Sequence, residues 1–471
     1  MSSEAPPYLG RSWWLVEAEG VDRGGECPPL REELDADVVI VGGGYTGLWT
    51  AYSLLELAPR TRVVLLEDKT CGSGPSGRNA GFCGGYWSSL DALVELFGDE
   101  RALALALAAE RSVDEVEEFC ARHGVDAWFV RAGALGVATA PAQAGRWKET
   151  VATARRLGVA ERALELTSRE VADRIRMPHR GGGMLVSDEA TVQPARLVLG
   201  LRRAVLALGA RVFENSRVTG VHGGPPVVAE TPGGTVRAEQ AVVATNAWLA
   251  TVPAFRSRLT VRGTYMLVTA PAPERLAEIG WTGGEAVWNF RSALNYLRTT
   301  RDGRIAFGTG AMQPGLARSI GPAFDWHRPF VAEVARQFRA LFPTFADVPL
   351  EAGWGGPIDV SGGHLPFVGR SFGGTVHHAA GFTGNGVGPC RLVGQILARR
   401  VLGMDDELTR LPIVDFEPKR FPPEPLRSTG ALLVNSAVLR LDRAEDADCA
   451  ADPRTGLVAR LPRRLGYHLG P

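Results

Sequence analysis

Short apolar runs and helically spaced apolar positions alternate over the first third of the chain. Residues 38–41 form an aliphatic run, and a glycine-rich bend separates it from the apolar-patterned segment 48–57. A second aliphatic run at residues 63–66 ends at the acidic residue Glu67. Short aliphatic runs bounded by turn residues are typical of buried strands, and the longer segment between them predicts a helix. The pattern therefore predicts strand, bend, helix and strand in that order.

The bend between the first strand and the helix has the spacing G-x-G-x-x-G. Gly42 permits a tight turn, Gly44 lets the backbone approach a pyrophosphate, and Gly47 lets the helix pack closely on the strand. The intervening Tyr45 and Thr46 belong to the helix N-terminus, whose free N–H groups and positive dipole end favour phosphate. Glu67 suits the hydroxyl pair of a ribose and would repel a phosphate at that position. This fingerprint predicts dinucleotide binding without separating FAD from NAD.

Later segments repeat nucleotide-binding features on either side of β-rich stretches. Helices are predicted at residues 99–123, 194–208, 330–342 and 389–401, and strands at 128–130, 135–139, 211–213, 217–219, 240–245 and 376–380. Residues 256–310 are rich in β-branched and aromatic residues with turn signals, which predicts an antiparallel sheet. Such interleaving is typical of a domain inserted into a nucleotide-binding domain.

We therefore expect an α/β fold in which a Rossmann-like nucleotide-binding domain carries an inserted α+β substrate domain built on an antiparallel sheet. The expected nucleotide-binding domain is discontinuous and comprises residues 36–88, 186–254 and 353–405. The substrate domain comprises residues 89–185 and 255–352. Residues 1–35, with their Trp13–Trp14 pair, are expected to be an arm across the body, and residues 406–471 a C-terminal extension over the surface.

Composition excludes several classes of function. Lys plus Arg equals Asp plus Glu at 52 each, so nothing favours nucleic acid or an anionic membrane surface. The six cysteines form no CxxC pair, and we expect neither a metal site nor a disulfide framework. No signal pattern or run of about 18 apolar residues is present, so a cytoplasmic location is expected.

Two further motifs accompany the fingerprint. One is the stretch from Gly74 to Gly81, which reads Gly-Pro-Ser-Gly-Arg-Asn-Ala-Gly. The other is the segment 363–369, Gly-His-Leu-Pro-Phe-Val-Gly, followed by the glycine loop 381–388 and a helix that Pro389 starts. With these motifs, residues 36–405 resemble the D-amino-acid oxidase family of FAD-dependent oxidoreductases, which includes glycine oxidase, sarcosine oxidase and γ-glutamylputrescine oxidase.

The resemblance implies roles for the residues that match the family motifs. Gly42, Gly44 and Gly47 would hold the FAD pyrophosphate, and Glu67 the adenosine ribose. Val218 would contact the adenine. The residues expected along the phosphates and the flavin are Ser76, Arg78, Asn79, Ala80, Thr245, Asn246, Ala247, Gly384, Asn385, Gly386 and Val387. A helix N-terminus with free N–H groups also suits the negative charge of reduced flavin, although an ordinary glycine turn is the alternative interpretation of that loop.

Two departures from the family bear on substrate and cofactor. Sarcosine oxidases use a Lys in the last glycine loop to bind the substrate carboxylate, and Gly388 stands in its place here. A simple α-amino acid then needs another cation, for which Arg298 and Arg291 are candidates. Residues 354–357 contain no Cys that could hold flavin covalently, so non-covalent FAD is expected. Cys83 is an alternative tether, and a buried inert thiol is its other interpretation.

Candidate residues for the reaction lie in the β-rich segment and in the second motif. The β-rich segment offers Tyr265, Trp288, Asn289, Tyr296 and Arg298 as candidates. Trp288 and Tyr296 could form aromatic walls beside the flavin, or they could be ordinary sheet core. His364 could act as a base, orient the flavin, or be structural. The pair His377–His378 is expected to bind no metal.

The expected reaction is hydride transfer from a C–H beside an amine nitrogen to flavin N5, giving an imine that water hydrolyses. The expected partners are a small amine and O2 or another electron acceptor. A flavin monooxygenase and a flavoprotein without catalytic activity are the alternatives.

Overall fold

The computed structural model describes residues 5–21, 25, 27–178, 181–314 and 320–467. Its first sheet follows the order β10 (Gly220–His222), β11 (Val227–Thr231), β12 (Gly234–Val243), β1 (Leu34–Val41), β2 (Val63–Leu66) and β9 (Arg211–Phe213). From β12 to β9 the neighbours run parallel, and the C-terminal half of β12 also pairs in parallel with β19 (Val376–Ala380). The antiparallel partner of β19 is β18 (Phe367–Ser371). This is the parallel nucleotide-binding sheet predicted from the sequence.

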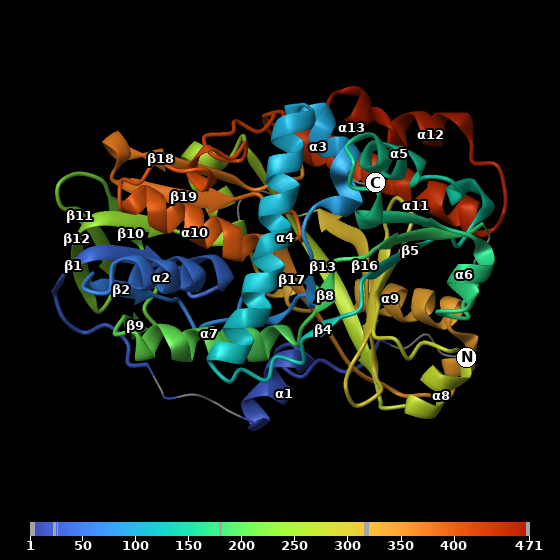
Figure 1. Ribbon diagram of the computed structural model, residues 1–471, viewed down its shortest axis with the longest axis horizontal. Coiled ribbons are helices and arrows are strands. Elements are labelled where there is room, and N and C mark those ends of the chain that lie inside the picture. The colour runs from blue at the N-terminus through green and yellow to red at the C-terminus, as the bar shows by residue number, and fades with distance from the viewer. Residues whose placement is uncertain (1–4, 22–24, 26, 179–180, 315–319, 468–471) are drawn as a thin grey trace.

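Helices cover the first sheet at the fingerprint. α2 (Tyr45–Leu57) packs between α10 (Pro389–Val401) and α7 (Pro194–Ala207), and α10 also touches α4 (Asp99–Arg122). Figure 1 shows α2 and α10 side by side over the sheet, with the long α4 crossing the middle of the molecule. Their apolar side chains form one large core with β1 and β2. Burial of this apolar area is the main stabilising term for this half.

The second sheet has the order β17 (Leu350–Ser361), β13 (Leu259–Thr269), β16 (Ile305–Pro314), β15 (Asn295–Thr299), β14 (Ala286–Asn289), β5 (Ala134–Val137), β7 (Gly183–Val186) and β6 (Ala163–Leu166). Its strands pair antiparallel except β5 with β14. One face packs against α9 (Arg328–Leu341) and α8 (Pro273–Glu278). The opposite face meets α1 (Trp13–Val21), where Trp13 and Trp14 are buried.

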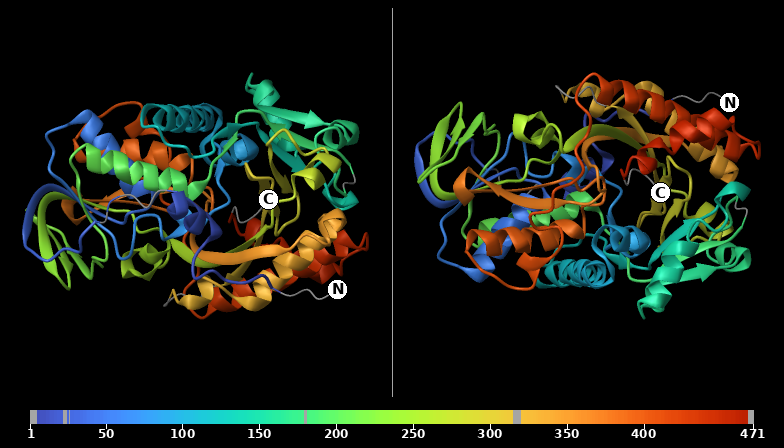
Figure 2. Two further views of the ribbon diagram at one scale, coloured as in Figure 1. Left: turned by 90° about the horizontal axis from the view of Figure 1, so that it is seen from below. Right: turned by 90° about the horizontal axis from the view of Figure 1, so that it is seen from above.

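Smaller elements link the two sheets. A three-stranded sheet of β3 (Phe82–Cys83), β8 (Ala190–Thr191) and β4 (Val130–Arg131) lies where the two halves meet (Figure 1). The remaining helices are α3 (Leu90–Phe97), α5 (Lys148–Arg156), α6 (Ser168–Ala172), α11 (Leu426–Asp446), α12 (Pro453–Ala459) and α13 (Leu461–Arg464). Both ends of the described chain lie on the side of the second sheet, as the views in Figure 2 agree.

Three local predictions differ from the structure. Of the strand expected at residues 128–130, only Val130 is in a strand, at the start of β4. The strand expected at residues 217–219 begins three residues later as β10, because only residues 220–222 pair with β11. The C-terminal extension contains the 21-residue helix α11, which the mixed composition of that segment did not predict. α11 packs against β16 of the second sheet, so tertiary contacts stabilise it.

Candidate nucleotide and substrate site

The early glycine bend cannot hold side chains at its key positions. Gly42 has φ +111°, and a Cβ there would lie 2.5 Å from the carbonyl oxygen of Ala244. A Cβ on Gly47 would overlap the carbonyl oxygen of Gly42. At Gly44 the nearest atom to a Cβ would be Ser76 Oγ, at 3.0 Å. Only glycine fits this geometry at the first and third positions, as the fingerprint predicts.

The first turn of α2 keeps backbone donors at the bend. The N-cap residue of α2 is Gly44, which has no side chain to cap the helix. Tyr45 N donates to Ser76 Oγ at 2.9 Å, which ties the bend to the second motif, and the Tyr45 hydroxyl donates to Pro194 O at 2.8 Å. Thr46 is buried behind the bend. A helix N-terminus whose N-cap residue makes no cap is a suitable phosphate site.

Glu67 lies beside the bend, at the carboxyl end of β2. Its carboxylate accepts hydrogen bonds from Gly43 N at 2.7 Å and from Lys69 N at 3.0 Å. Burial raises the pKa of Glu67, and these two N–H donors partly oppose that shift. The carboxylate therefore supports the bend, and its role toward a ribose stays a prediction.

The second motif forms a short 3₁₀ turn at Pro75–Gly77 and then crosses toward the second sheet. The Arg78 guanidinium pairs with Asp325 and donates to Gly355 O at 3.2 Å. The Asn79 amide donates to Pro75 O at 3.1 Å and accepts from Gly81 N at 2.7 Å. Ala80 packs with Trp354 and Tyr296 in one apolar cluster. Arg78 thus connects the nucleotide side to the second sheet.

The late glycine loop meets the early bend in space. Thr46 Oγ1 lies 3.1 Å from Cys390 Sγ in the first turn of α10. Asn385 Nδ2 donates to Gly85 O at 3.3 Å, just beyond the second motif. Gly384 has φ +86°, while Gly386 and Val387 pack toward Cys390 and the core. The three motifs, far apart in the sequence, therefore form one continuous site.

Asp359 joins the remaining motif residues, and the sequence analysis missed it. Its fully buried carboxylate accepts from Asn246 Nδ2 at 3.0 Å and from Gly381 N at 2.5 Å. Burial raises its pKa to about 6, against the effect of these donors. Thr245 precedes this contact at the end of β12, and Ala247 is buried after it. A single acid in a β-rich run gives no sequence signal for such a role.

The position of the family lysine has no room for a side chain. A Cβ on Gly388 would lie 2.5 Å from the carbonyl oxygen of Gly84, which is backbone and cannot rotate away. The nearest Cβ contact for Gly386 is ordinary, at 3.5 Å from Cys390 Sγ. The absence of a cation at Gly388 is therefore built into the packing of the loop.

Strand register places the candidate aromatic residues on one face of the second sheet. Trp288 pairs with Tyr296, Tyr296 with Gly308, and Met266 with both Gly308 and Trp354, and directly opposite residues share a face. The Tyr296 ring meets the edge of Phe82 at a centroid distance of 6.4 Å. This face is turned toward the second motif.

The opposite face of the sheet takes two residues that the sequence analysis placed near the reaction. Tyr265 stacks on Phe330 of α9 at 5.3 Å, and its hydroxyl donates to Ala323 O. The Asn289 amide donates to Asn295 in the same interior at 3.0 Å. Both residues belong to the core beneath α9, because alternate residues of a strand point to opposite faces.

Both cations proposed to replace the family lysine already have partners within the protein. Arg291 is buried and pairs with Asp446 at 3.3 Å and Asp442 at 3.8 Å, both on α11. Arg298 is 2% exposed, donates to Val192 O and lies over the Trp14 ring at 5.6 Å. Burial lowers the pKa of Arg298 to about 9. These contacts give both arginines a structural role, and a role toward the substrate stays a prediction.

The other candidates occupy varied environments. His364 has φ +57° in the turn after β17, and this turn packs on Gly381. Cys83 is fully buried, and burial raises the pKa of its thiol, which fits an inert thiol. Val218 is half-buried against the cluster beneath β11.

The described residues contain no group of three or more potential metal ligands, and His377 and His378 are buried in β19.

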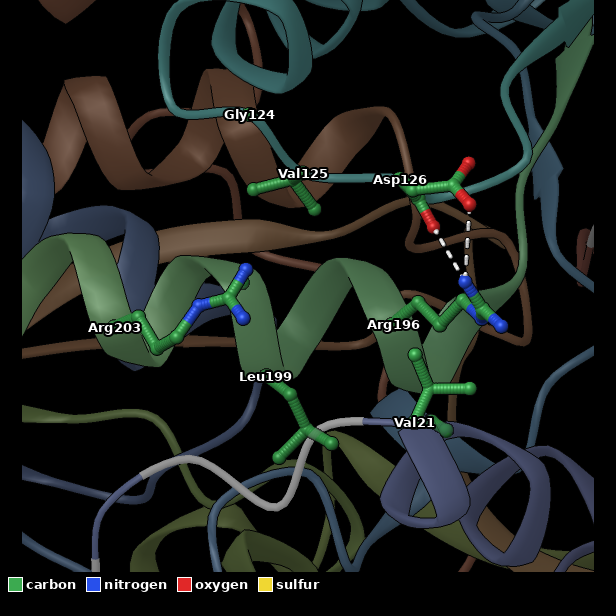
Figure 3. A pocket seen from close by; sticks show the side chains of 9 residues that line it. Val21, Gly124, Val125, Asp126, Arg196, Leu199 and Arg203 are labelled. Atoms are coloured by element: carbon green, nitrogen blue, oxygen red, sulfur yellow. Dashed lines mark hydrogen bonds and ion pairs between the residues drawn. The ribbon is translucent and has the colours of Figure 1, made fainter.

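A separate cavity of about 180 Å³ lies between α1 and α7, away from the glycine loops. Figure 3 shows it bordered by Arg196, Arg203, Leu199 and Val21, with Arg196 bound to Asp126. None of these residues belongs to the three motifs.

Among the described helices, none combines the length and the apolar character needed to cross a membrane.

Comparison with known proteins decides the family. The family model described as FAD dependent oxidoreductase (DAO) matches residues 37–400. The chain belongs to this family. As an FAD-dependent oxidoreductase of this family it uses FAD, and the glycine cradle and uncapped α2 N-terminus described above fit that group.

Relatives of this FAD-dependent oxidoreductase match most of the length of the chain. The probable oxidoreductase OrdL of Rhizobium meliloti is 30% identical over 418 residues, which are 87% of this chain and 92% of the relative. The gamma-glutamylputrescine oxidoreductase of Escherichia coli is 29% identical over 409 residues, which are 85% of this chain and 92% of the relative.

Solved structures agree on the fold. The glycine oxidase of Geobacillus kaustophilus superposes with a TM-score of 0.65 at 25% identity, covering 79% of this chain and 96% of that one. The L-proline dehydrogenase of P. horikoshii superposes with a TM-score of 0.66 at 20% identity, and the match covers 81% of this chain and 96% of that one.

Proposed function

We propose that the protein oxidises a carbon–nitrogen bond of an amine or amino-acid-like substrate and passes the electrons to O2. The observation that supports this most directly is the junction of the late glycine loop with the early bend. The aromatic face of the second sheet meets the chain just after the second motif, where Tyr296 lies against Phe82. Relatives named gamma-glutamylputrescine oxidoreductase and glycine oxidase support the substrate class.

FAD would supply the acceptor for a hydride at its N5 atom. The chain would hold its pyrophosphate at Gly42, Gly44 and Gly47, and its ribose at Glu67. Loss of a hydride from the C–H beside nitrogen would leave an iminium ion, which becomes an imine when its N–H proton leaves, and addition of water would then give a carbonyl compound and a free amine. Transfer of two electrons with two protons to O2 gives hydrogen peroxide.

The protein's own contribution would be orientation and exclusion of water. Trp288 and Tyr296 would provide an apolar wall, which favours the neutral form of an amine over its ammonium form. A neutral amine has the lone pair that assists departure of the hydride. We also propose that FAD is bound without a covalent link, since the described cysteines near the site are buried and Cys83 is packed in β3.

Anaerobic titration of the purified holoprotein with a panel of amines and amino acids tests this function. Bleaching of the flavin band at about 450 nm, followed by peroxide release on adding air, is the expected result. NAD(P)H consumption with oxygen uptake would instead show a monooxygenase. No reduction by any amine would contradict the proposal and favour a flavoprotein without catalytic activity. Acid precipitation that releases all flavin would support non-covalent binding.

A further inference from the structure

A buried carboxylate lies against the segment that meets the late glycine loop. Glu189, immediately before β8, is only 7% exposed. Its Oε1 atom lies 2.7 Å from the point where a Cβ on Gly84 would be, so the carboxyl group occupies the space left by that glycine. The carbonyl oxygen of Gly84 in turn lies against Gly388 in the late glycine loop. The carboxylate is thus next to the loop expected to border the flavin.

No counter-ion from the described residues accompanies this carboxylate. Within the described parts of the chain, Glu189 Oε1 and Oε2 form neither a hydrogen bond nor an ion pair. The neighbouring cation Arg131, on β4 beside β8, is held by Asp188, Asp114 and Glu117. A buried carboxylate without a partner is unfavourable when it is charged, so this site gains from a cationic ligand.

The surroundings of Glu189 are otherwise neutral or acidic. Cys83 of β3 faces it as a neutral thiol, and Asp188 precedes it in the chain. From α4, Glu110 binds Trp87 and Arg162, and burial and the Asp188 charge raise the pKa of Glu110. Burial first, and the Asp188 charge second, raise the pKa of Glu189 to about 7. The group therefore changes charge near neutral pH.

We propose that Glu189 binds the positively charged nitrogen of the substrate beside the late glycine loop, so that the preferred substrates are cationic amines. This inference rests on the proposed function and narrows its substrate class. The missing cation at Gly388 agrees with it, because a carboxylate-binding group at that position is sterically excluded. On binding, the ammonium N–H donates to the carboxylate, and a proton moved from nitrogen to Glu189 leaves the neutral amine that oxidation requires.

Calorimetric binding to the oxidised holoprotein under anaerobic conditions tests the proposal with a readout other than turnover. Butylamine is the cationic probe and butyrate the anionic probe of similar size. Wild type should bind butylamine more tightly as pH rises through about 7, because ionised Glu189 is the acceptor. Glu189→Gln should weaken butylamine binding about tenfold or more and remove this pH dependence, while butyrate binds no more weakly.

Two further variants keep the test decisive. Asp188→Asn removes a neighbouring charge of equal size, and it should retain butylamine affinity while its pH profile moves to lower pH. Glu189→Asp keeps the charge and should recover part of the affinity. Equal butylamine affinity in wild type and Glu189→Gln would overturn the inference. If amines reduce the flavin of wild type in that case, the proposed function stands and only the role of Glu189 fails.

Discussion

Among single residues, the site depends on glycines that leave room and on an acid that lacks a counter-ion in the part of the chain that the structure describes. Gly42 and Gly47 are required by backbone contacts, and Gly84 makes the space that the Glu189 carboxylate fills. Gly74, at the start of the second motif, has open space where a Cβ would lie and an ordinary negative φ of −78°. Glycines of the same site therefore differ sharply in their tolerance of a side chain.

Gly47→Ala should abolish or strongly weaken FAD binding, because the added methyl group overlaps Gly42 O and forces the bend apart. The flavin content of the purified variant, read from its absorbance, measures the effect. Gly74→Ala is the matched control and should purify with wild-type flavin content. A yellow, fully loaded Gly47→Ala protein would contradict the role of the bend.

Glu189→Gln should stabilise the ligand-free protein at alkaline pH relative to wild type. The folded-state pKa of Glu189, about 7, lies above its usual 4.5, so the folded protein holds this proton longer than the unfolded chain. Wild-type stability is therefore lost as pH rises through this window, whereas the amide does not titrate. Between about pH 5 and about pH 8 the variant should gain roughly 2–3 kcal/mol on wild type. Denaturant unfolding at the two pH values measures this, and a pH-independent difference would refute it.

Among the secondary-structure elements, β17 connects the two halves of the site. It pairs with β13 in the second sheet, and its Asp359 binds Asn246 after β12 and Gly381 after β19. Trp354 of the same strand donates to Arg78 O at 2.8 Å. One strand thus fixes the late glycine loop and the second motif relative to the second sheet.

Asp359→Asn should destabilise the protein by about 1–3 kcal/mol, because Asn246 Nδ2 and Gly381 N donate to different oxygens of the carboxylate and the amide replaces one of these oxygens with an NH2 group. We also expect weaker FAD binding, since Gly381 begins the late loop. Thermal unfolding and the dissociation constant for FAD are the measurements. Glu351→Gln, at the exposed start of the same strand, should change neither quantity appreciably. A wild-type midpoint for Asp359→Asn would show that the contact contributes little.

At the scale of the whole molecule, the C-terminal helix α11 packs against the second sheet and binds one of its turns. Asp442 is fully buried and accepts from Ser292 N and Ala293 N, both at 2.9 Å. Arg291 lies 3.8 Å from the same carboxylate, and Glu445 pairs with Arg146 at 2.6 Å. The extension therefore anchors the turn between β14 and β15, which carry Trp288 and Tyr296.

Asp442→Asn should lower the free energy of unfolding by about 3–5 kcal/mol, because it leaves Arg291 with reduced compensation and one buried N–H without an acceptor. Calorimetric unfolding of the holoprotein measures the loss. Asp448→Asn, two residues beyond α11 and exposed, is the control and should unfold like wild type. An unchanged midpoint for Asp442→Asn would mean that α11 is dispensable for this half.

The order of residues was enough to predict the fingerprint, the second motif and the glycine loop, and through them the family and the cofactor. These features are readable because each depends on backbone geometry within a few residues, such as the positive φ of Gly42 and the close packing of Gly47. Strands and helices with strong apolar periodicity were readable for the same reason.

Only the tertiary structure showed which charged side chains have partners within the protein and which do not. Arg291 and Arg298 looked like free cations in the sequence, but α11 and Val192 bind them. Asp359 and Glu189 gave no local signal, because their surroundings come from segments more than 20 residues away. Burial and pairing depend on which distant segments meet, and that is set by the packing of the whole chain.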